Sequence, residues 1–327
     1  MSGKLSMPVL DVQGLKAYYS TLRGDVKAVD GVSFTVEKGE ALGIAGESGC
    51  GKTTLALSLL RLLPSGGKII SGKVVFDGTS LGDLTDEELR KKVRWKGMSL
   101  VFQGAMNAFN PVFKIGDQIV EAIKYHEPGT STKEAWKRAG NLLELVGIDR
   151  DRAQNYPHEF SGGMKQRALI AMALCLNPRL LIADEPGTAL DVIVQAQVLK
   201  LMRELRQKLD LGMIIISHDL SILAETCEKL AIMYAGKVVE YGDVFELFKE
   251  PLHPYTQGLV GAFPKVKGPR TKLLSVPGSP PDLLDPPLGC HFHPRCPYAM
   301  DVCKQTEPEL LKLGSKEHYV ACYLYPH

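Results

Sequence analysis

The stretch Gly46-Glu47-Ser48-Gly49-Cys50-Gly51-Lys52-Thr53, followed by Thr54, decides the fold. It matches the pattern G-x-x-x-x-G-K-[ST] at every fixed position. The apolar run at 41–45 predicts a buried strand before it, and the periodicity of 53–63 predicts a helix after it. A glycine-rich turn entering a helix presents backbone N–H groups to an anion. The segment therefore predicts a phosphate-binding loop in an α/β fold, with Lys52 at the β- and γ-phosphates and Thr53 on Mg²⁺. Cys50 is interpreted as a small filler.

A second candidate site follows the apolar run at 180–183, which predicts a central parallel strand. The run ends in two carboxylates, Asp184 and Glu185. Buried strands end in this way when the charges face a ligand at the carboxyl edge of a sheet. Together with the phosphate-binding loop, the pattern predicts that Asp184 holds Mg²⁺ and that Glu185 polarises the attacking water.

Composition and charge bound the class of protein. The 327 residues are 45% hydrophobic and 23% charged, and the formal net charge is +2, so no electrostatic feature indicates a nucleic-acid partner. We find no run of about 18 apolar residues that would predict a membrane-spanning helix. The first ten residues lack the apolar core of a signal peptide. The sequence predicts a cytosolic chain that reaches a membrane only through other subunits.

The segment that narrows the class is Phe160-Ser161-Gly162-Gly163-Met164-Lys165-Gln166-Arg167. Here the chain resembles the ATP-binding-cassette family, whose signature has the form [LF]-S-G-G-x-x-x-R. The resemblance implies an ATPase of the P-loop NTPase class with a helical subdomain. It also implies that Ser161, Gly162, Gly163 and Met164 bind the ATP held by a partner subunit. Met164 stands where many members carry Gln.

Further residues match the family in order along the chain. Gln103 matches the glutamine that contacts Mg²⁺ and water, and His218 matches the histidine that contacts the γ-phosphate. Ala189-Leu190-Asp191 matches the loop that crosses the dimer interface. Tyr19 aligns with the aromatic residue that stacks on adenine, with Tyr18 as an alternative. Gly187 stands where many relatives carry Thr or Ser, which puts one turn contact in doubt.

Longer strings resemble the oligopeptide/dipeptide importer branch of the family. They include the residues around 101–111, 161–174 and 191–199, and the segment His253-Pro254-Tyr255-Thr256-Gln257-Gly258-Leu259. The resemblance implies a pair of non-identical motor subunits, two transmembrane permease subunits and an extracytoplasmic binding protein. It places the chain peripherally on the cytoplasmic face of the cell membrane. The same branch also serves nickel and oligosaccharides, so the cargo stays open between these and peptides.

The composition changes near Pro251, where prolines become frequent and periodicity fades. We therefore predict an ATPase domain over 1–250, with a helical subdomain at about 104–176, and a small irregular extension over 251–327. Within the ATPase domain we expect strands at 9–12, 26–29, 32–36, 98–102 and 213–217, helices at 80–96, 115–146, 163–176, 192–209 and 220–227, and a hairpin at 229–241.

Four of the seven cysteines crowd into the extension: Cys290, Cys296, Cys303 and Cys322, with five, six and eighteen residues between them. In a reducing cytosol this clustering favours metal binding over disulfides. The spacing lacks the C-x₂₋₄-C pairs usual in structural zinc sites, and four thiolates suit a [4Fe–4S] cluster. Some importers that this chain resembles carry such a cluster. Zinc, with His291 or His293 as a replacement ligand, and a metal-free tail are the alternatives.

The sequence thus predicts an ATPase that drives import through an ABC transporter, with ATP, Mg²⁺ and an iron–sulfur cluster as cofactors. One rival is a soluble cassette ATPase of DNA repair or translation, which would usually carry a coiled-coil insertion or a second cassette. The other rival is an iron–sulfur redox sensor with a vestigial ATPase, which the complete set of catalytic motifs disfavours. A transporter working in the export direction is a third option, which the importer-like extension disfavours.

Overall fold

The computed structural model describes residues 7–104, 107–262, 276–314 and 317–326. By its internal contacts the chain divides into two compact units. The first comprises the chain up to Val9, Val36–Glu40 and Asp77–Ile216, and the second comprises Leu10–Thr35, Ala41–Phe76 and Ser217–His327. Prolines 264 and 269, which suggested an irregular extension, lie outside the described residues. The boundary near residue 250 stays a prediction.

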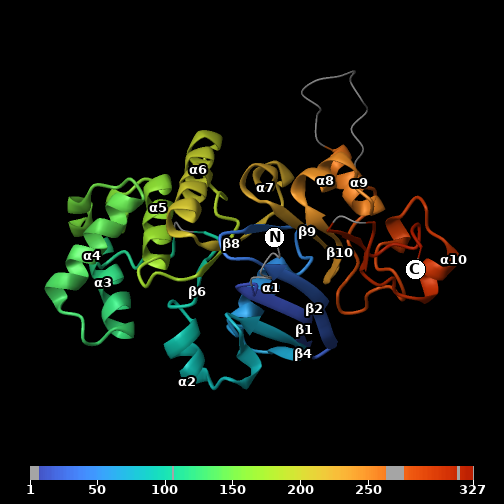
Figure 1. Cartoon of the computed structure of the whole chain (residues 1–327), viewed down its shortest axis with the longest axis horizontal. Helices are drawn as coiled ribbons and strands as arrows, with labels where there is room; N and C mark the ends of the chain where they lie inside the picture. Colours follow the sequence, from blue (N-terminus) through green and yellow to red (C-terminus); the bar gives the residue numbers. More distant parts are fainter. Residues whose placement is uncertain (1–6, 105–106, 263–275, 315–316, 327) are drawn as a thin grey trace, which may run out of the picture. The chain divides into compact units, whose positions relative to one another are not determined.

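The first unit carries a parallel sheet and a group of helices (Figure 1). Its strands run in the order β8-β7-β6, and β7 pairs in parallel with both neighbours. The elements are β5 Thr79–Ser80, 3-10 turn η1 Leu81–Asp83, α2 Asp86–Glu88, π-turn η2 Leu89–Val93, β6 Met98–Val101, α3 Ile115–His126, α4 Thr132–Leu145, 3-10 turns η4 Arg150–Gln154 and η5 Pro157–Glu159, α5 Gly162–Ala173, β7 Leu180–Asp184, α6 Val192–Leu209 and β8 Gly212–Ser217.

Two predicted helices of this unit are broken in the structure. The helical pattern at 115–146 divides into α3 and α4, because Pro128 and Gly129 interrupt it and Ser131 caps the second helix by accepting a hydrogen bond from the Glu134 amide. The charged segment at 80–96 forms only short turns around α2. Only Leu89 and Val93 are buried in the π-turn that follows α2. Because most of the stability of a helix in a protein comes from packing, so small a buried face does not sustain a long helix here.

The strands of the second unit belong to two sheets, and the buried strand β3 is part of one of them. Strand β1 lies between β2 and β4, and β3 pairs in parallel with β9, which continues through β10 and β12 to β11. The elements are β1 Leu10–Thr21, β2 Gly24–Val36, β3 Ala41–Ala45, α1 Lys52–Leu59, β4 Gly67–Phe76, α7 Leu220–Thr226, β9 Lys229–Tyr234, β10 Lys237–Asp243, α8 Val244–Lys249, α9 Pro254–Gly261, 3-10 turn η6 His293–Arg295, α10 Asp301–Gln305, β11 Leu311–Lys312 and β12 His318–Val320.

The C-terminal extension has more regular structure than its sequence predicts. Strand β12 pairs with β10, with Val320 opposite Glu240, so the extension lengthens a sheet of the second unit. Buried His318 and Glu240 join the two strands, with 2.7 Å between Nε2 and the carboxylate. The strand is only three residues long and was not predicted, because three residues carry too little alternation to be recognised.

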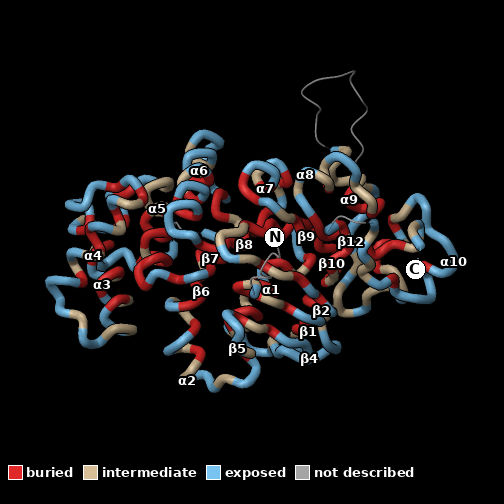
Figure 2. The backbone as a smooth tube through the Cα atoms, in the orientation of Figure 1, coloured by how far each residue is buried: buried red, intermediate tan, exposed pale blue. Residues whose placement is uncertain are grey.

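Buried strands β3 and β7 lead into the two candidate sites. Every residue of both strands is buried, and Figure 2 shows this for β7. Gly43 of β3 is closely packed, since a Cβ there would lie 2.5 Å from the side chain of Leu230. Each strand is therefore fixed by packing up to the residue where its functional loop begins.

Candidate functional site

The phosphate-binding loop turns from β3 into α1 through backbone conformations that only glycine adopts easily. Gly46 has φ +154° and Gly51 has φ +106°. A Cβ on Gly51 would lie 1.9 Å from the Ala28 carbonyl oxygen, and a Cβ on Gly46 would lie 2.2 Å from that of Met233. The two glycines therefore allow the loop to pass directly against its neighbouring strands. Helix α1 begins at Lys52 with Gly51 as its N-cap, so its free N–H groups face the loop.

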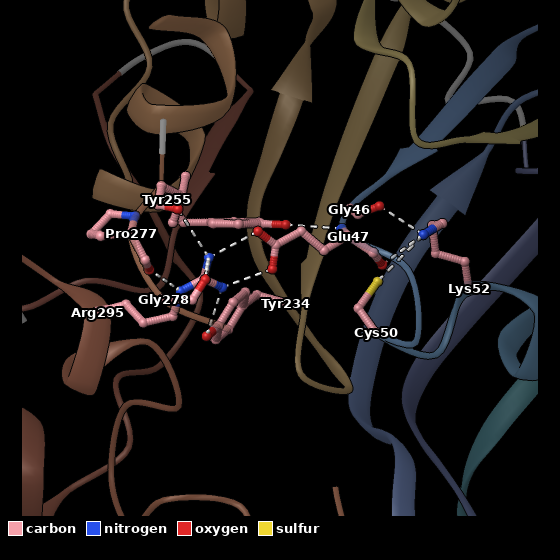
Figure 3. A network of polar contacts seen from close by, with 10 residues as sticks. Gly46, Glu47, Cys50, Lys52, Tyr234, Tyr255, Pro277, Gly278 and Arg295 are labelled. Atoms are coloured by element: carbon pink, nitrogen blue, oxygen red, sulfur yellow. Dashed lines mark hydrogen bonds and ion pairs between the residues drawn. The ribbon is translucent and has the colours of Figure 1, made fainter. Parts of the chain in front are cut away.

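Lys52 is buried and bound within its own loop. Its ammonium group donates to the carbonyl oxygens of Gly46 at 2.7 Å and Glu47 at 2.9 Å (Figure 3). Its nitrogen lies 3.7 Å from the Cys50 sulfur. Burial raises the pKa of the Cys50 thiol, and nearby Lys52 only partly opposes this shift. The cysteine is thus neutral at physiological pH, which fits the interpretation of Cys50 as a small filler.

Tyr18 and Tyr19, the two candidates for the aromatic residue that stacks on adenine, have different surroundings in the structure. The Tyr19 hydroxyl lies 3.4 Å from the Thr54 hydroxyl in the first turn of α1. The Tyr18 hydroxyl instead donates to the Asp30 carboxylate at 2.6 Å, and burial with this hydrogen bond raises the pKa of Tyr18. Of the two rings, Tyr19 is the one placed beside the phosphate-binding loop.

Glu185, directly after β7, is held by two donors. Gln103 Nε2 lies 2.9 Å from Glu185 Oε2, and the Thr188 hydroxyl donates to the same oxygen at 2.8 Å. Glu185 also has φ +47°, a left-handed conformation that costs a non-glycine residue about 1 kcal/mol. Its amide donates to the Ile216 carbonyl at 2.9 Å, which holds the turn in place. Asp184, one residue earlier, is buried.

Thr188 was not predicted as a site residue. Its only sequence signal was its position three residues after Glu185, within a segment whose Gly187 departs from the family pattern. A Cβ on Gly187 would lie 2.5 Å from the Gln195 side chain, so the glycine leaves room for Gln195. The departure from the family pattern at Gly187 thus coincides with close packing against Gln195 of α6.

The signature segment begins a helix, as predicted. Ser161 is the N-cap of α5, and its hydroxyl accepts a hydrogen bond from the Met164 amide at 3.3 Å. Ser161 is exposed, and Gly163 packs so closely that a Cβ would lie 2.4 Å from Val194. Asp191 in turn caps α6 by accepting from the Val194 amide at 2.9 Å. The two predicted interface segments thus start neighbouring helices in the first unit.

His218 follows β8 directly and is exposed. The next residue, Asp219, is the N-cap of α7 and accepts from the Ser221 amide at 2.8 Å. The cap fixes the direction of the chain on the far side of the histidine.

The four C-terminal cysteines all line one small cavity in the second unit. All seven cysteines of the chain belong to the described residues and carry free thiols. Burial raises the pKa values of Cys290 and Cys322 to about 11, so these thiols are protonated at neutral pH when no metal is bound. Among the described residues, no three His, Cys, Asp or Glu side chains converge closely enough to hold a single metal ion. The cavity leaves about 10 Å³ of room, the space of about one water molecule.

A larger cavity of about 720 Å³ lies elsewhere in the second unit. Of the candidate site residues, Cys290 and His291 line it. Three of its charged groups are paired with one another, because the Lys237 ammonium lies 2.9 Å from the Asp30 carboxylate and 2.6 Å from that of Glu307. Size alone would make this cavity the candidate site, but it lacks the backbone donors and glycines of the phosphate-binding loop.

Comparison with known proteins agrees with this geometry. The family model for ABC transporters matches residues 29–188, and the model for the oligopeptide/dipeptide transporter C-terminal region matches residues 239–303. The dipeptide transport ATP-binding protein DppD of Caldanaerobacter subterraneus is 42% identical over 97% of each chain. The oligopeptide transport ATP-binding protein OppD of Salmonella typhimurium is 43% identical over 96% of this chain and 93% of its own.

The chain belongs to the ATP-binding subunits of oligopeptide/dipeptide ABC transporters. A solved dimeric bacterial ABC transporter cassette superposes with a TM-score of 0.64 and 27% identity, covering 72% of this chain and 98% of the cassette. A post-hydrolysis form of such a cassette, bound to ADP and phosphate, superposes equally well at 26% identity. In this ABC ATPase, no helix among the described residues has the length and apolar character needed to cross a membrane.

Gly51→Ala is expected to lower the free energy of unfolding by about 2–4 kcal/mol and to abolish ATP binding, because the new Cβ combines a strained φ with overlap on the Ala28 carbonyl. Gly14 has φ +56° with open space around it, so Gly14→Ala should lose only about 1 kcal/mol and keep ATP affinity. Urea unfolding and calorimetric titration with ATP measure both quantities. Equal effects in the two variants would show that overlap with Ala28 is unimportant.

Thr188→Val is expected to lower kcat for ATP hydrolysis about three- to tenfold, because the Glu185 carboxylate loses one of its two donors. Thr188→Ser retains the hydroxyl and should stay near the wild-type rate. Steady-state phosphate release, with ATP affinity measured in parallel, provides the test. A Val variant that hydrolyses at the wild-type rate would contradict the role of the Thr188 hydrogen bond.

Proposed function

We propose that this subunit hydrolyses ATP to drive the import of di- and oligopeptides. The relatives of this chain are named as dipeptide and oligopeptide transport ATP-binding proteins, and its C-terminal region matches the corresponding transporter model. The single observation that carries the catalytic part is the placement of Glu185 at the end of buried β7, beside Asp184 and held by Gln103 and Thr188.

The catalytic roles follow from the type and place of each side chain. Lys52 and the backbone N–H groups of the phosphate-binding loop would bind the phosphates, since they combine positive charge with a helix N-terminus. Thr53, Asp184 and Gln103 would hold Mg²⁺ through hard oxygen atoms. Glu185 would orient and deprotonate the attacking water. His218 would contact the γ-phosphate, and Tyr19 would stack on adenine.

A second, related ATPase subunit is the expected partner. The exposed N-terminus of α5 at Ser161 presents amide groups that no residue within the helix can satisfy. The phosphates of a nucleotide held by a partner would satisfy them. The comparison with a dimeric cassette supports such an assembly. The loop Ala189-Leu190-Asp191 would lie at the same interface.

Two permease subunits would hold the chain at the cytoplasmic face of the membrane, and an extracytoplasmic binding protein would deliver the cargo. Three large apolar side chains of the first unit are exposed: Phe102, which directly precedes Gln103, and Val112 and Phe113, which follow it by nine and ten residues, are 49%, 69% and 54% exposed. Exposed apolar groups of this size are typical of protein–protein contacts. Because Phe102 directly precedes Gln103, a permease contact at this segment would link the membrane subunits to the site of hydrolysis.

The cysteine cavity would hold an iron–sulfur cluster. Four thiols on one cavity are the donor set of a [4Fe–4S] cluster, in which each thiolate binds a different iron. A single zinc ion needs four ligands converging on one point, an arrangement that the described side chains do not show. The water-sized room means that the loops carrying the thiols would open to admit a cluster. When bound, such a cluster would tie four parts of the extension together.

Glu185→Gln is expected to retain ATP affinity and to lose hydrolysis by a factor of about 100 or more, because the amide cannot accept the proton of the attacking water. Lys52→Ala should lose ATP binding itself. Neither variant should restore uptake of labelled di- and oligopeptides in cells that lack the subunit, whereas the wild-type chain should. Uptake of nickel or an oligosaccharide in place of peptides would overturn the proposed cargo. Hydrolysis by the Gln variant would overturn the role of Glu185.

Protein purified without oxygen is expected to contain about four iron and four sulfide ions per chain, with broad absorption near ~400 nm. Cys303→Ser should lower the iron content, while Cys175→Ala, which changes a buried cysteine outside the cavity, should not. Metal analysis and absorption spectroscopy give the result. One zinc ion per chain in place of iron would show that the cavity holds structural zinc and not a cluster. The absence of both metals would contradict a metal site of either kind.

A further inference from the structure

Arg295 of the C-terminal extension is buried against the phosphate-binding loop. Its side chain is 6% exposed, yet it ends on the carboxylate of Glu47, the second residue of the loop motif. The contact is bidentate, with Nη1 2.7 Å from Oε2 and Nη2 3.0 Å from Oε1 (Figure 3). A two-pronged guanidinium–carboxylate pair fixes orientation as well as distance.

The remaining donors of this guanidinium are also used. Nε donates to the Pro277 carbonyl at 2.7 Å, and Nη2 reaches the Gly278 carbonyl at 3.2 Å. Nη1 also lies 3.3 Å from the Tyr234 hydroxyl. The hydrogen bond to Glu47 raises the pKa of Arg295, so this guanidinium is charged at any physiological pH. Arg295 thus joins the loop to two separate segments, the chain at 277–278 and strand β9.

A second contact from the extension reaches the backbone of the same residue. The Glu47 amide donates to the Tyr255 hydroxyl at 2.9 Å. Tyr255 is fully buried in α9, and its ring centre lies 4.7 Å from that of Tyr234 and 5.4 Å from that of Phe292. Its hydroxyl is therefore held in position by aromatic packing. Glu47 is consequently fixed at both its side chain and its amide.

We propose that Arg295 and Tyr255 are positioning residues of the ATP site, which hold the phosphate-binding loop in its nucleotide-accepting form before ATP arrives. Tyr255 accepts a hydrogen bond from the Glu47 amide, which lies at the beginning of the loop. It therefore leaves free the helix N-terminus at Lys52, where the phosphates would bind. A loop that is ordered in advance loses less conformational freedom on binding, so its affinity for ligand is higher. The extension therefore sets nucleotide affinity from outside the catalytic motifs.

The inference rests on ATP binding by this subunit and goes beyond it by assigning a role to the extension. Tyr255→Phe is the sharpest variant, because it removes only the hydroxyl and leaves the aromatic packing. It is expected to raise the Kd for ATP about three- to tenfold, as for the loss of one hydrogen bond. The kcat at saturating ATP should stay the same, which is the kinetic signature of lost uniform binding.

Tyr325→Phe is the matched control. The Tyr325 hydroxyl also belongs to the extension, and it donates to the Leu252 carbonyl at 3.1 Å, away from the loop. This variant should keep wild-type ATP affinity. Isothermal titration of the full chain with ATP and Mg²⁺, together with thermal unfolding without nucleotide, separates affinity from stability. If Tyr255→Phe only lowers the unfolding temperature and leaves the Kd unchanged, the residue is structural and the proposal fails.

A double-mutant cycle tests Arg295 independently. Glu47→Gln and Arg295→Lys each weaken the bidentate pair while keeping side chains of similar length. If the pair positions the loop, Glu47→Gln should raise the Kd for ATP by a smaller factor in the Arg295→Lys background than in the wild type. Equal factors in both backgrounds would overturn the role of the pair. A wild-type chain that binds no ATP at all would instead refute the proposed function.

Discussion

The structure around the nucleotide site depends on one backbone constraint, the reversal of the chain between β3 and α1. The loop has to bring the first N–H groups of α1 to the phosphates while it passes against two neighbouring strands. At Gly51 the Ala28 carbonyl leaves no room for a Cβ, and at Gly46 the Met233 carbonyl does the same. The positive φ angles of these glycines follow from that confinement. Lys52 can then turn back on the loop carbonyls, which supply oxygen acceptors for its buried side-chain nitrogen.

A different constraint governs the catalytic carboxylate. Glu185 lies at the end of a buried strand in a left-handed conformation, which is unfavourable for a residue with a Cβ. The strain is offset by the hydrogen bond from its amide to the Ile216 carbonyl and by the donors Gln103 and Thr188 on its side chain. Strained backbone persists where the surroundings over-determine it, and it concentrates at functional sites. The conformation of Glu185 is thus a property of the whole turn after β7.

The sequence allowed the local elements around the motifs to be predicted, because each motif carries its own physical signal. Helix α6 was predicted with its observed bounds, since the capping residue Asp191 precedes an uninterrupted periodic run. Strands β3 and β7 were recognised from short apolar runs followed by glycine or acid. Strand β4 was missed, because much of it is exposed and it reads Gly67–Phe76 without clear alternation. The residues at 26–29 and 32–36 form one strand, β2, through Asp30 and Gly31.

Contacts between residues far apart in the chain could not be predicted in this way. Thr188 lies near Glu185 in sequence, but nothing in its neighbourhood showed that its hydroxyl would turn toward the carboxylate. Arg295 and Glu47 are 248 residues apart, and each alone is an ordinary charged residue. Only the packing of α9 and the 3-10 turn at 293–295 in the second unit brings them together.

The burial of Arg295 shows why the extension and the loop depend on each other. A guanidinium that is 6% exposed loses most of its hydration, and its burial is tolerated only because Glu47 supplies an opposite charge and two further segments supply oxygen acceptors. Removing the Glu47 carboxylate would leave the Arg295 guanidinium buried and uncompensated, which typically costs about 3–5 kcal/mol. Arg295 also directly precedes Cys296, whose thiol lines the cysteine cavity. One peptide unit and one ion pair therefore link the cysteine cavity to Glu47 of the phosphate-binding loop.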